Sequence, residues 1–285
     1  MPNPAPDVNS DPVVARLRGE IAARGWQVPG FALHVLRERR TRYCVCIPAI
    51  DEGQRLLAQL GRMRAGGITD QADVLLLDGG STDGSTDPQA LAALGVRALL
   101  VKIGPGGQGA QVRMGFAYAL LEGYAGIVTV DGNGKDGVEA IPRFLGSLDD
   151  GYDFVQGSRY LPGGRAIRTP LARTLAIHLL HVPATRLASG FRYTDTTNAF
   201  RGHSRALLSD PRVRPFRDVF DSYELLAYLS MRAPQLGFRT VEIPVARAYS
   251  RDEMAQTKIS PVRGNLRLLG ILWKALRGQY DPPAD

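Results

Sequence analysis

The sequence predicts an α/β fold in which a mostly parallel central sheet carries helices on both faces. Between residues 43 and 157, short apolar runs rich in β-branched residues alternate with longer segments of helical spacing, a pattern typical of parallel sheets. Several of these runs end in turns that contain glycines and carboxylates. A chain of 285 residues, 44% of them apolar, is also long enough to bury a large core.

The predicted elements follow one another in a regular order. Asp11 and Pro12 suit the N-cap and the first position of a helix that extends to about residue 24. Strands are then predicted at 43–47, 74–77, 96–103, 127–130 and around Phe154, and helices at 52–64, 88–94, 108–122 and 138–148. Farther along, the sequence predicts helices at 171–188, 223–231 and 262–276 and a strand at 239–243.

These elements form one large domain with two short flanking segments. Residues 1–10 are predicted to be a flexible proline-rich arm, residues 11–260 a single domain, and residues 261–285 an amphipathic helix with a tail. Within the domain, 11–42 is expected to be a helical cover of the sheet, followed by a first half at 43–157 and a second half at 158–260.

The charge balance favours an anionic partner. Lys and Arg number 35 against 28 Asp and Glu, which gives a net charge of +7. No basic stretch with interleaved aromatic residues occurs, so nucleic acid is not an expected partner. The sequence contains neither a run of about 18 apolar residues nor the apolar core of a signal peptide, which predicts a cytoplasmic protein without a spanning helix.

The cysteines and two of the histidines are expected to be structural. Cys44 and Cys46 lie on one face of a predicted strand with too little chain between them for an easy disulfide, so both are predicted to be reduced and buried. His178 and His181 share a helix face. Because no third ligand is near them in the sequence, ordinary packing is favoured over a metal site.

Two strand ends carry polar residues that have two interpretations each. Asp51 and Glu52 follow the first strand, where they either accept hydrogen bonds from a ribose or base or cap the next helix. Asp78, Ser81 and Asp83 follow the second strand, in a glycine-rich turn that either binds a ligand or only reverses the chain. Because the ends of parallel strands meet at one edge of a sheet, their convergence favours a binding site.

A glycine-rich segment after the third strand imitates a dinucleotide-binding motif. Residues 104–109 fit the spacing G-x-G-x-x-G. In dinucleotide-binding folds, however, the motif follows the first strand and an acid occurs about 20 residues later. Here Pro105 occupies the tight turn and no such acid is present, so the sequence argues against a dehydrogenase.

The most informative turn follows the strand at 127–130 and contains Asp131, Asn133, Lys135 and Asp136. An acidic turn at this edge of a sheet is where a metal-bound phosphate is expected. The second acid expected two residues after Asp131 is replaced by Asn133, whose amide oxygen can ligate a metal but adds no charge. Two interpretations stay open, a weaker metal site or a lysine that partly replaces the metal.

Six motifs occur in a fixed order: Ile47-Pro-x-x-Asp-Glu52, Leu77-Asp-Gly-Gly-Ser-Thr-Asp-Gly-Ser85, Gly109-Ala-x-x-Arg113-x-Gly115-x-x-x-Ala119, Val130-Asp-Gly-Asn-Gly134, Gly157-Ser-Arg-Tyr160 and Thr194-Asp-Thr-Thr-Asn-Ala-Phe-Arg201. This set resembles the family-2 glycosyltransferases, and within them the dolichyl- and polyprenyl-phosphate sugar synthases. The resemblance covers about residues 43 to 260. It implies a GT-A fold and an inverting transfer of a sugar from a nucleotide-diphosphate donor to a lipid-phosphate or glycan acceptor, in cell-envelope or glycoconjugate synthesis.

For the donor, the resemblance implies that residues 43–157 bind the nucleotide. The implied nucleotide-binding residues are Pro48, Asp51, Glu52, Asp78, Ser81, Asp83, Gly109, Arg113 and Asp131. Asp131 matches the first acid of the DxD motif. With Asn133 it is therefore the expected ligand of a Mg²⁺ or Mn²⁺ ion that bridges the donor phosphates.

For the acceptor, the resemblance implies that residues 158–260 form the second side of the cleft. Asp195 is expected to be the general base or to orient the acceptor, and a base is needed only by a hydroxyl acceptor because a phosphate is already anionic. Arg165 and Arg168 are expected near the acceptor entrance or on solvated surface. The expected contacts to diphosphate or acceptor are Lys135, Arg159, Arg201, Arg251 and Lys258.

The predicted final helix at 262–276 has two interpretations. It combines Leu269 and Trp273 with Lys274 and Arg277, so it either rests on an anionic membrane surface as a peripheral contact or packs on the domain.

Two other functions were weighed against a glycosyltransferase. A sugar nucleotidyltransferase needs a glycine-rich loop with Arg and Lys directly after the first strand, and the loop at 50–53, Ile-Asp-Glu-Gly, does not provide it. A catalytically impaired nucleotide-sugar-binding protein of the same fold is the other alternative, in which Asn133 has cost the protein its transfer activity.

Overall fold

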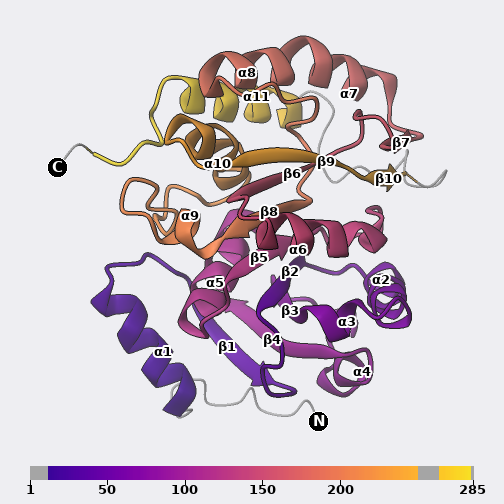
Figure 1. Ribbon diagram of the computed structural model, residues 1–285. Coiled ribbons are helices and arrows are strands. Elements are labelled where there is room, and N and C mark those ends of the chain that lie inside the picture. The colour runs from indigo at the N-terminus through magenta and orange to yellow at the C-terminus, as the bar shows by residue number, and fades with distance from the viewer. Residues whose placement is uncertain (1–11, 250–262, 284–285) are drawn as a thin grey trace.

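A mixed sheet of eight strands runs through the part of the chain described by the computed structural model, residues 12–249 and 263–283, and helices cover both of its faces (Figure 1). Its strands are β1 (Gly30–Val35), β2 (Tyr43–Ala49), β3 (Asp73–Asp78), β4 (Val96–Ile103), β5 (Gly126–Thr129), β6 (Phe154–Ser158), β8 (Arg201–Ser204) and β9 (Thr240–Pro244). The strand order is β1-β4-β3-β2-β5-β8-β6-β9. Strands β4, β3, β2 and β5 are mutually parallel, whereas β1 and β8 run antiparallel to their neighbours. The predicted α/β class with a mostly parallel sheet is confirmed.

The alternation of side chains in the central strands divides the core into two layers. Every residue of β2 and β3 is buried. Cys44 and Cys46 point into the hydrophobic cluster on one face, while Val45 and Ile47 point into the cluster on the other. Both cysteines are free and buried, as predicted.

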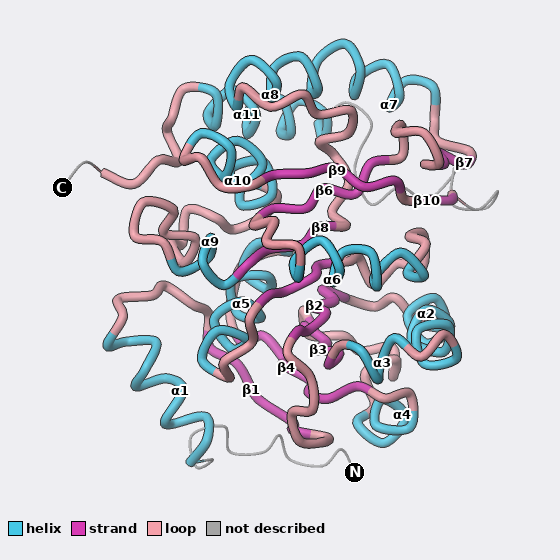
Figure 2. Tube along the Cα trace, in the orientation of Figure 1, coloured by secondary structure: helices cyan, strands magenta, loops and turns pink. Residues whose placement is uncertain are grey.

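Helices and strands alternate along much of the chain, as Figure 2 shows. Those of the first half are α1 (Pro12–Ala23), α2 (Gln54–Ala65), α3 (Ile68–Gln71), α4 (Pro88–Ala93), α5 (Gln108–Leu121), the 3₁₀ turn η1 (Val138–Ala140) and α6 (Ile141–Asp149). Leu56 of α2 and Phe144 of α6 pack on one face of the sheet, and Leu17 of α1 and Phe116 of α5 pack on the other. Helix α4 begins as the sequence suggests, because Asp87 accepts a hydrogen bond from the backbone N–H of Ala90 and Pro88 occupies the first turn.

Beyond β6, the described residues add the helical segment predicted at 171–188, two short strands outside the main sheet and three further helices. The elements are β7 (Arg165–Ile167), α7 (Leu171–Ala176), the π-helical turn η2 (Ile177–His181), α8 (Val182–Ser189), α9 (Arg205–Ser209), α10 (Glu224–Gln235), β10 (Ala246–Ala248) and α11 (Arg263–Leu276). Pro183 has no N–H to donate to the carbonyl of Leu179, which explains the wide turn within this helix. Strand β10 pairs in parallel with β7, outside the main sheet.

The helical cover expected for residues 11–42 is wrong in its second part. Only α1 is helical, and β1 forms the edge of the sheet antiparallel to β4. One face of β1 is only partly buried, so its apolar alternation is weak. Strand β8 was also missed, because Arg201, His203 and Ser204 give it a polar sequence although it lies between β5 and β6. Residues 1–10 lie outside the described part of the chain.

Gly109 offers a test of how tightly α5 is packed. A Cβ on Gly109 would lie 2.5 Å from the carbonyl oxygen of Ser222 and 2.6 Å from that of Phe220. We therefore expect Gly109→Ala to lower the free energy of unfolding by about 1–3 kcal/mol. The measurement is urea denaturation of the full chain.

Gly61 of α2 is the matched control, since a Cβ there would meet nothing within 4 Å. Gly61→Ala should be neutral or stabilise by up to about 1 kcal/mol. Equal stability of the two variants would contradict the packing of α5 described above.

Candidate active site

Three strand ends meet at one edge of the sheet and are joined by backbone hydrogen bonds. The register pairs Ala49 at the end of β2 with Asp78 at the end of β3. Gly79 donates to the carbonyl of Ala49 (2.8 Å) and Gly132 to that of Pro48 (3.2 Å). The turns after β2, β3 and β5 therefore lie side by side, as the sequence predicted.

The predicted nucleoside residues form a network between the first two turns. Asp78 accepts hydrogen bonds from the backbone and hydroxyl of Ser81, the latter at 2.6 Å. Asp51, whose φ is +48°, accepts from the backbone of Thr82 (2.7 Å), and Asp83 accepts from that of Gly53 (2.8 Å). The turn-forming role considered for Asp78, Ser81 and Asp83 is confirmed, whereas the capping role considered for Asp51 is wrong, because the N-cap of α2 is Gly53, without a side-chain cap. Their contact with a nucleoside stays a prediction.

Asp131 lies in the turn after β5, and a residue of α2 makes hydrogen bonds to both ends of this turn. Gln59, fully buried on α2, donates to the carbonyl of Asp131 (3.0 Å) and accepts from the backbone of Gly134 (3.0 Å). The carboxylate of Asp131 accepts from Gln108 at 2.9 Å and from Arg247 at 3.2 Å. Gln59 and Gln108 therefore fix the position of the most informative acid in the sequence.

Arg247 on β10 connects two acids of this turn. Its guanidinium lies 3.2 Å from Asp131 and 2.5 Å from Asp136, and the residue is only 7% exposed. Burial disfavours the charged form of Arg247, but Asp136 and Asp131 outweigh it and raise its pKa above the ordinary value. Sequence reasoning missed Arg247, because its partners are more than 100 residues away and no motif marks it.

The oxygen atoms around Asp131 do not fit a Mg²⁺ or Mn²⁺ site in this arrangement. The amide oxygen of Asn133 accepts from the backbone of Lys135 (3.2 Å), and its nitrogen donates to Asp131 (3.4 Å). Asp136 is taken by Arg247. Among the residues that the structure describes, no group of three or more acidic, His or Cys side chains is placed to hold a metal ion.

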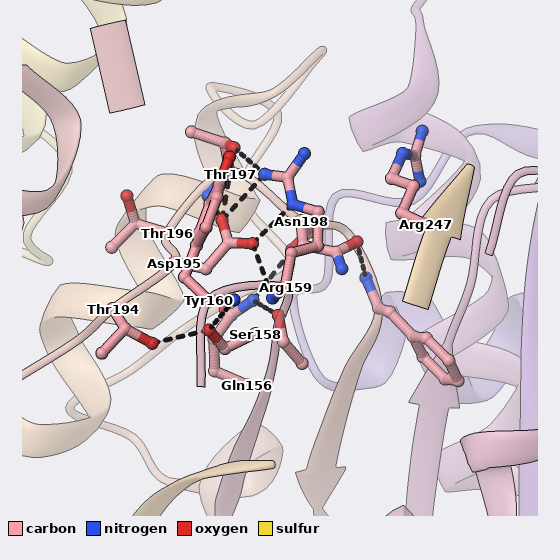
Figure 3. Close-up of polar contacts among 12 residues, drawn as sticks. Gln156, Ser158, Arg159, Tyr160, Thr194, Asp195, Thr196, Thr197, Asn198 and Arg247 are labelled. Atoms are coloured by element: carbon pink, nitrogen blue, oxygen red, sulfur yellow. Dashed lines mark hydrogen bonds and ion pairs between the residues drawn. The ribbon is translucent and has the colours of Figure 1, made fainter. Parts of the chain in front are cut away.

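A second buried ion pair joins Arg159, at the end of β6, to Asp195 (Figure 3). The guanidinium makes two parallel contacts to the carboxylate, at 2.6 and 2.9 Å, and a third to Thr197 at 2.7 Å. From β9, Glu242 accepts hydrogen bonds from the backbones of Thr194 and Asp195. Glu242, which the sequence analysis missed, thereby anchors this loop.

The environment of Asp195 argues against its role as a general base. Its side chain is fully buried. Burial raises the pKa of Asp195, but the hydrogen bonds and charge of Arg159 outweigh it and hold the pKa below its ordinary value. A general base must come within hydrogen-bond reach of the proton that it removes. The contacts show another role, which was not among those predicted: Asp195 orients Arg159 and the loop around it.

Cations surround Tyr249, which immediately follows β10. The Lys135 ammonium lies 5.1 Å from the ring centroid, and the guanidiniums of Arg247 and Arg173 lie 5.8 and 5.9 Å from it. Burial raises the pKa of Tyr249, but Arg173, Arg247 and Arg159 outweigh it and bring the pKa below its ordinary value. This part of the site therefore has a positive potential.

Beside this cluster lies a hollow of about 440 Å³ that we call the basic groove, lined by Arg55, Ala58, Gln59, Arg62, Asn133, Gly134, Lys135, Arg168, Ala248 and Tyr249. Its cations come from α2, from the turn after β5 and from the segment after β7. Lys135 and Arg168 were expected here, whereas Arg55, Arg62 and Tyr249 were not. An anionic group of the size of a phosphate suits such a surface.

Several predicted contact residues lie elsewhere. Arg113 and Arg201 are buried, and their guanidiniums donate to backbone carbonyls, those of Phe220 and Gln27 for Arg113 and those of Asn198, Thr196 and Leu226 for Arg201. In this structure these arginines hold loops together, and their contacts to nucleotide and diphosphate stay predictions. Gly109 is a packing residue, Arg165 is exposed on β7, and Arg159 is buried. Arg251 and Lys258 lie outside the described residues.

Comparison with known proteins identifies the family. No family model matches the chain. The chain is 30% identical over 224 residues to the undecaprenyl-phosphate mannosyltransferase of Micrococcus luteus, an alignment that covers 77% of this chain and 88% of that protein. The chain belongs to the family-2 glycosyltransferases. It is also 29% identical over 245 residues to the polyprenol monophosphomannose synthase of Mycolicibacterium smegmatis, covering 84% and 89% of the two chains.

A solved glycosyltransferase structure confirms the GT-A fold. Glucosyl-3-phosphoglycerate synthase from Mycobacterium tuberculosis, in complex with Mn²⁺, uridine diphosphate and phosphoglyceric acid, superposes with a TM-score of 0.57. The two chains are 16% identical, and the match covers 92% of this chain and 82% of that one. The predicted family, fold and enzyme class are therefore confirmed. Among the described residues, the helices are too short or too polar to cross a membrane.

The Arg159–Asp195 pair yields a stability prediction. Asp195→Asn leaves a buried guanidinium without its counter-charge, so we expect a loss of about 3–5 kcal/mol in the free energy of unfolding at pH 7. Because the folded-state pKa of Asp195 is depressed, this contribution is present above about pH 4 and is lost as the pH falls through the folded pKa. Urea denaturation of wild type and variant between pH 7 and pH 3 measures the difference.

Asp149→Asn is the matched control, because Asp149 pairs with Arg42 on the surface with side chains 53% and 67% exposed. Its loss should not exceed about 1 kcal/mol. Wild-type stability of the Asp195 variant at pH 7 would show that the buried pair does not stabilise the fold.

Proposed function

We propose that this glycosyltransferase moves a sugar from a nucleoside-diphosphate donor to a polyprenyl phosphate, with inversion at the anomeric carbon. The observation that carries the proposal is the meeting of the Asp131 turn with the basic groove at the edge of the sheet where the strands β2, β3 and β5 end. Membership of the family and the two named lipid-phosphate relatives support it.

On the donor side, the turns after β2 and β3 offer an acidic surface next to the cationic one. Asp51 and Asp83 are exposed there, and carboxylates suit the hydroxyls of a ribose or the N–H groups of a base. The diphosphate would then lie toward Asp131 and Lys135. Uridine diphosphate is named in the complexes of the structural neighbours, which supports a nucleoside-diphosphate donor.

On the acceptor side, a phosphate explains why no general base needs to be exposed. A phosphate oxygen is already anionic at neutral pH and attacks without losing a proton. Such an acceptor needs cations that position it, and Arg55, Arg168 and Lys135 line the groove beside the turn. The buried state of Asp195 therefore favours a phosphate acceptor over a glycan hydroxyl.

A lipid acceptor also fits an exposed apolar face at the other side of the cleft. Leu171, Leu175, Leu179 and Leu187 of the α7–α8 segment are 73%, 49%, 67% and 87% exposed, and the spacing of four residues places the first three in one row. We call this row the leucine face. Helix α11 lies beside α8 in Figure 1 and contributes Trp273, which is 55% exposed.

The leucine face supports a peripheral membrane contact made jointly by two segments. An apolar groove of about 460 Å³ lies between them, lined by Leu179, Leu180, Pro183, Ala184, Leu269, Leu272, Trp273 and Leu276. Arg186, Lys274 and Arg277 are exposed at its margins and suit anionic headgroups. Leu272 of α11 is buried, so part of the final helix packs on the domain while Trp273 faces outward.

Two alternatives are less well supported. A nucleotidyltransferase is disfavoured because the turn after β2 carries Asp51 and Glu52 where that reaction needs cations. A protein that only binds nucleotide sugars would follow from Asn133, but Arg247 and Lys135 place two positive charges beside Asp131 and Asp136.

Transfer itself is the first test of the proposal. The full chain, incubated with radiolabelled UDP- and GDP-sugars and polyprenyl phosphate, should form a lipid-linked sugar, and Asp131→Ala should slow this by about 100-fold or more because the turn loses its organising acid. Asp149→Ala, far from the turn on α6, is the control and should transfer at the wild-type rate. Absence of product with every donor would refute the proposal.

The leucine face is tested by binding to anionic vesicles. Leu175→Glu/Leu179→Glu should weaken co-sedimentation with vesicles of phosphatidylglycerol by about tenfold or more, since two charges replace apolar side chains at the lipid boundary. Val35→Glu is the control, because Val35 is 52% exposed on β1 at the opposite end of the molecule. Unchanged vesicle binding of the double variant would exclude this face as the membrane contact.

A further inference from the structure

Positive side chains lie beside Asp131, in the turn after β5, where a metal ion is expected to bind in family-2 enzymes of this fold. Arg247 contacts both Asp131 and Asp136, and the carboxylate of Asp136 is fully buried against it. We propose that Arg247 and Lys135 supply the positive charge beside the donor diphosphate in place of a divalent metal, so that donor binding and transfer proceed without one. This inference rests on the proposed use of a nucleoside-diphosphate donor.

The backbone brings the two cations together. Asp136 and Arg247 form an isolated antiparallel bridge, Ala248 donates to the carbonyl of Lys135 at 2.9 Å, and Gly137 donates to that of Ala246 at 2.9 Å. Residues 135–137 and 246–248 thus run side by side as a short ribbon. The two side chains come from this ribbon and both lie within 6 Å of the Tyr249 ring.

The local charges disfavour a divalent ion at Asp131. A dication bound to this carboxylate would lie close to the guanidinium of Arg247, which is itself 3.2 Å from the same carboxylate. Like charges at such distances repel strongly where water is scarce. Releasing Arg247 would also leave Asp136 buried without a counter-charge, which is costly.

The two residues that depart from the DxD pattern change the site in the same direction. Asn133 removes one negative charge, and its oxygen is directed to the backbone of Lys135 instead of outward. Lys135 adds one positive charge and lines the basic groove. The reference is a DxD turn with acids at positions 131 and 133 and a neutral side chain at position 135. Compared with it, positions 133 and 135 of this chain together are more positive by two charges, which equals the charge of a divalent ion.

The chemistry requires only such charge. A phosphate oxygen of the acceptor forms the new bond to the anomeric carbon while the bond from that carbon to the diphosphate oxygen breaks. The electron pair of the broken bond goes to the diphosphate, which leaves with one additional negative charge. Charge-assisted hydrogen bonds from Arg247 and Lys135 would stabilise that charge, and no proton has to move.

The test is calorimetric titration of the full chain with UDP and with GDP, in excess EDTA and in Mn²⁺. We expect one of the two nucleotides to bind with the same Kd in both conditions, and transfer to continue at an unchanged rate in EDTA. Binding or transfer that appears only with Mn²⁺ would overturn the inference and leave the proposed function intact. Failure of both nucleotides to bind in either condition would count against both.

Variants separate the contributions of the two departures. Lys135→Ala should weaken nucleotide binding in EDTA by about tenfold, whereas Arg42→Ala, at a surface arginine that is 67% exposed, should leave it unchanged. Asn133→Asp/Lys135→Gln should acquire Mn²⁺ binding, measured by the loss of the free Mn²⁺ signal in electron paramagnetic resonance, and should need the ion for nucleotide binding. Wild-type protein that binds Mn²⁺ as tightly as this double variant would refute the inference.

Discussion

The contact of Arg247 with Asp131 and Asp136 is the interaction on which the geometry of the site depends. It joins the turn after β5, in the first half of the chain, to β10 near the end of the second half. Since Gln59 contacts the backbone carbonyl of Asp131 and Gln108 its carboxylate, four segments meet at this one residue. A surface that receives a diphosphate, as proposed for this one, benefits from such preorganisation, because its charges need not rearrange when the substrate binds.

The second buried pair, Arg159 with Asp195, follows the same principle at the neighbouring strand end. Buried ion pairs contribute little net stability over apolar packing, but removing one partner is costly. Their value here is that the loops around β6 and β10 have few other arrangements available. Glu242 extends this constraint to β9, because it accepts hydrogen bonds from the backbones of Thr194 and Asp195.

The basic groove and the leucine face have complementary properties for a lipid phosphate. A headgroup needs cations, and a prenyl chain needs apolar surface that is open to a membrane. Arg173 links the two regions, because it lies on α7 between Leu171 and Leu175 and its guanidinium is 5.9 Å from the ring of Tyr249, which lines the groove. The helical segment that carries the leucine face thus begins beside the site.

Much of the fold could be predicted from the sequence, because β2, β3, β4 and α5 are marked by local periodicity and by the glycines and acids at their ends. The convergence of Asp51, Asp78 and Asp131 followed from the parallel arrangement alone. The edge strand β1 and the polar strand β8 could not be predicted, since their places depend on pairing with distant strands. The roles of Arg113, Arg201, Arg247 and Asp195 likewise depended on burial and on partners far along the chain. The sequence by itself determined which residues carry charge and which strand ends present it; only the tertiary structure decided which of these charges neutralise one another and which remain available to a substrate.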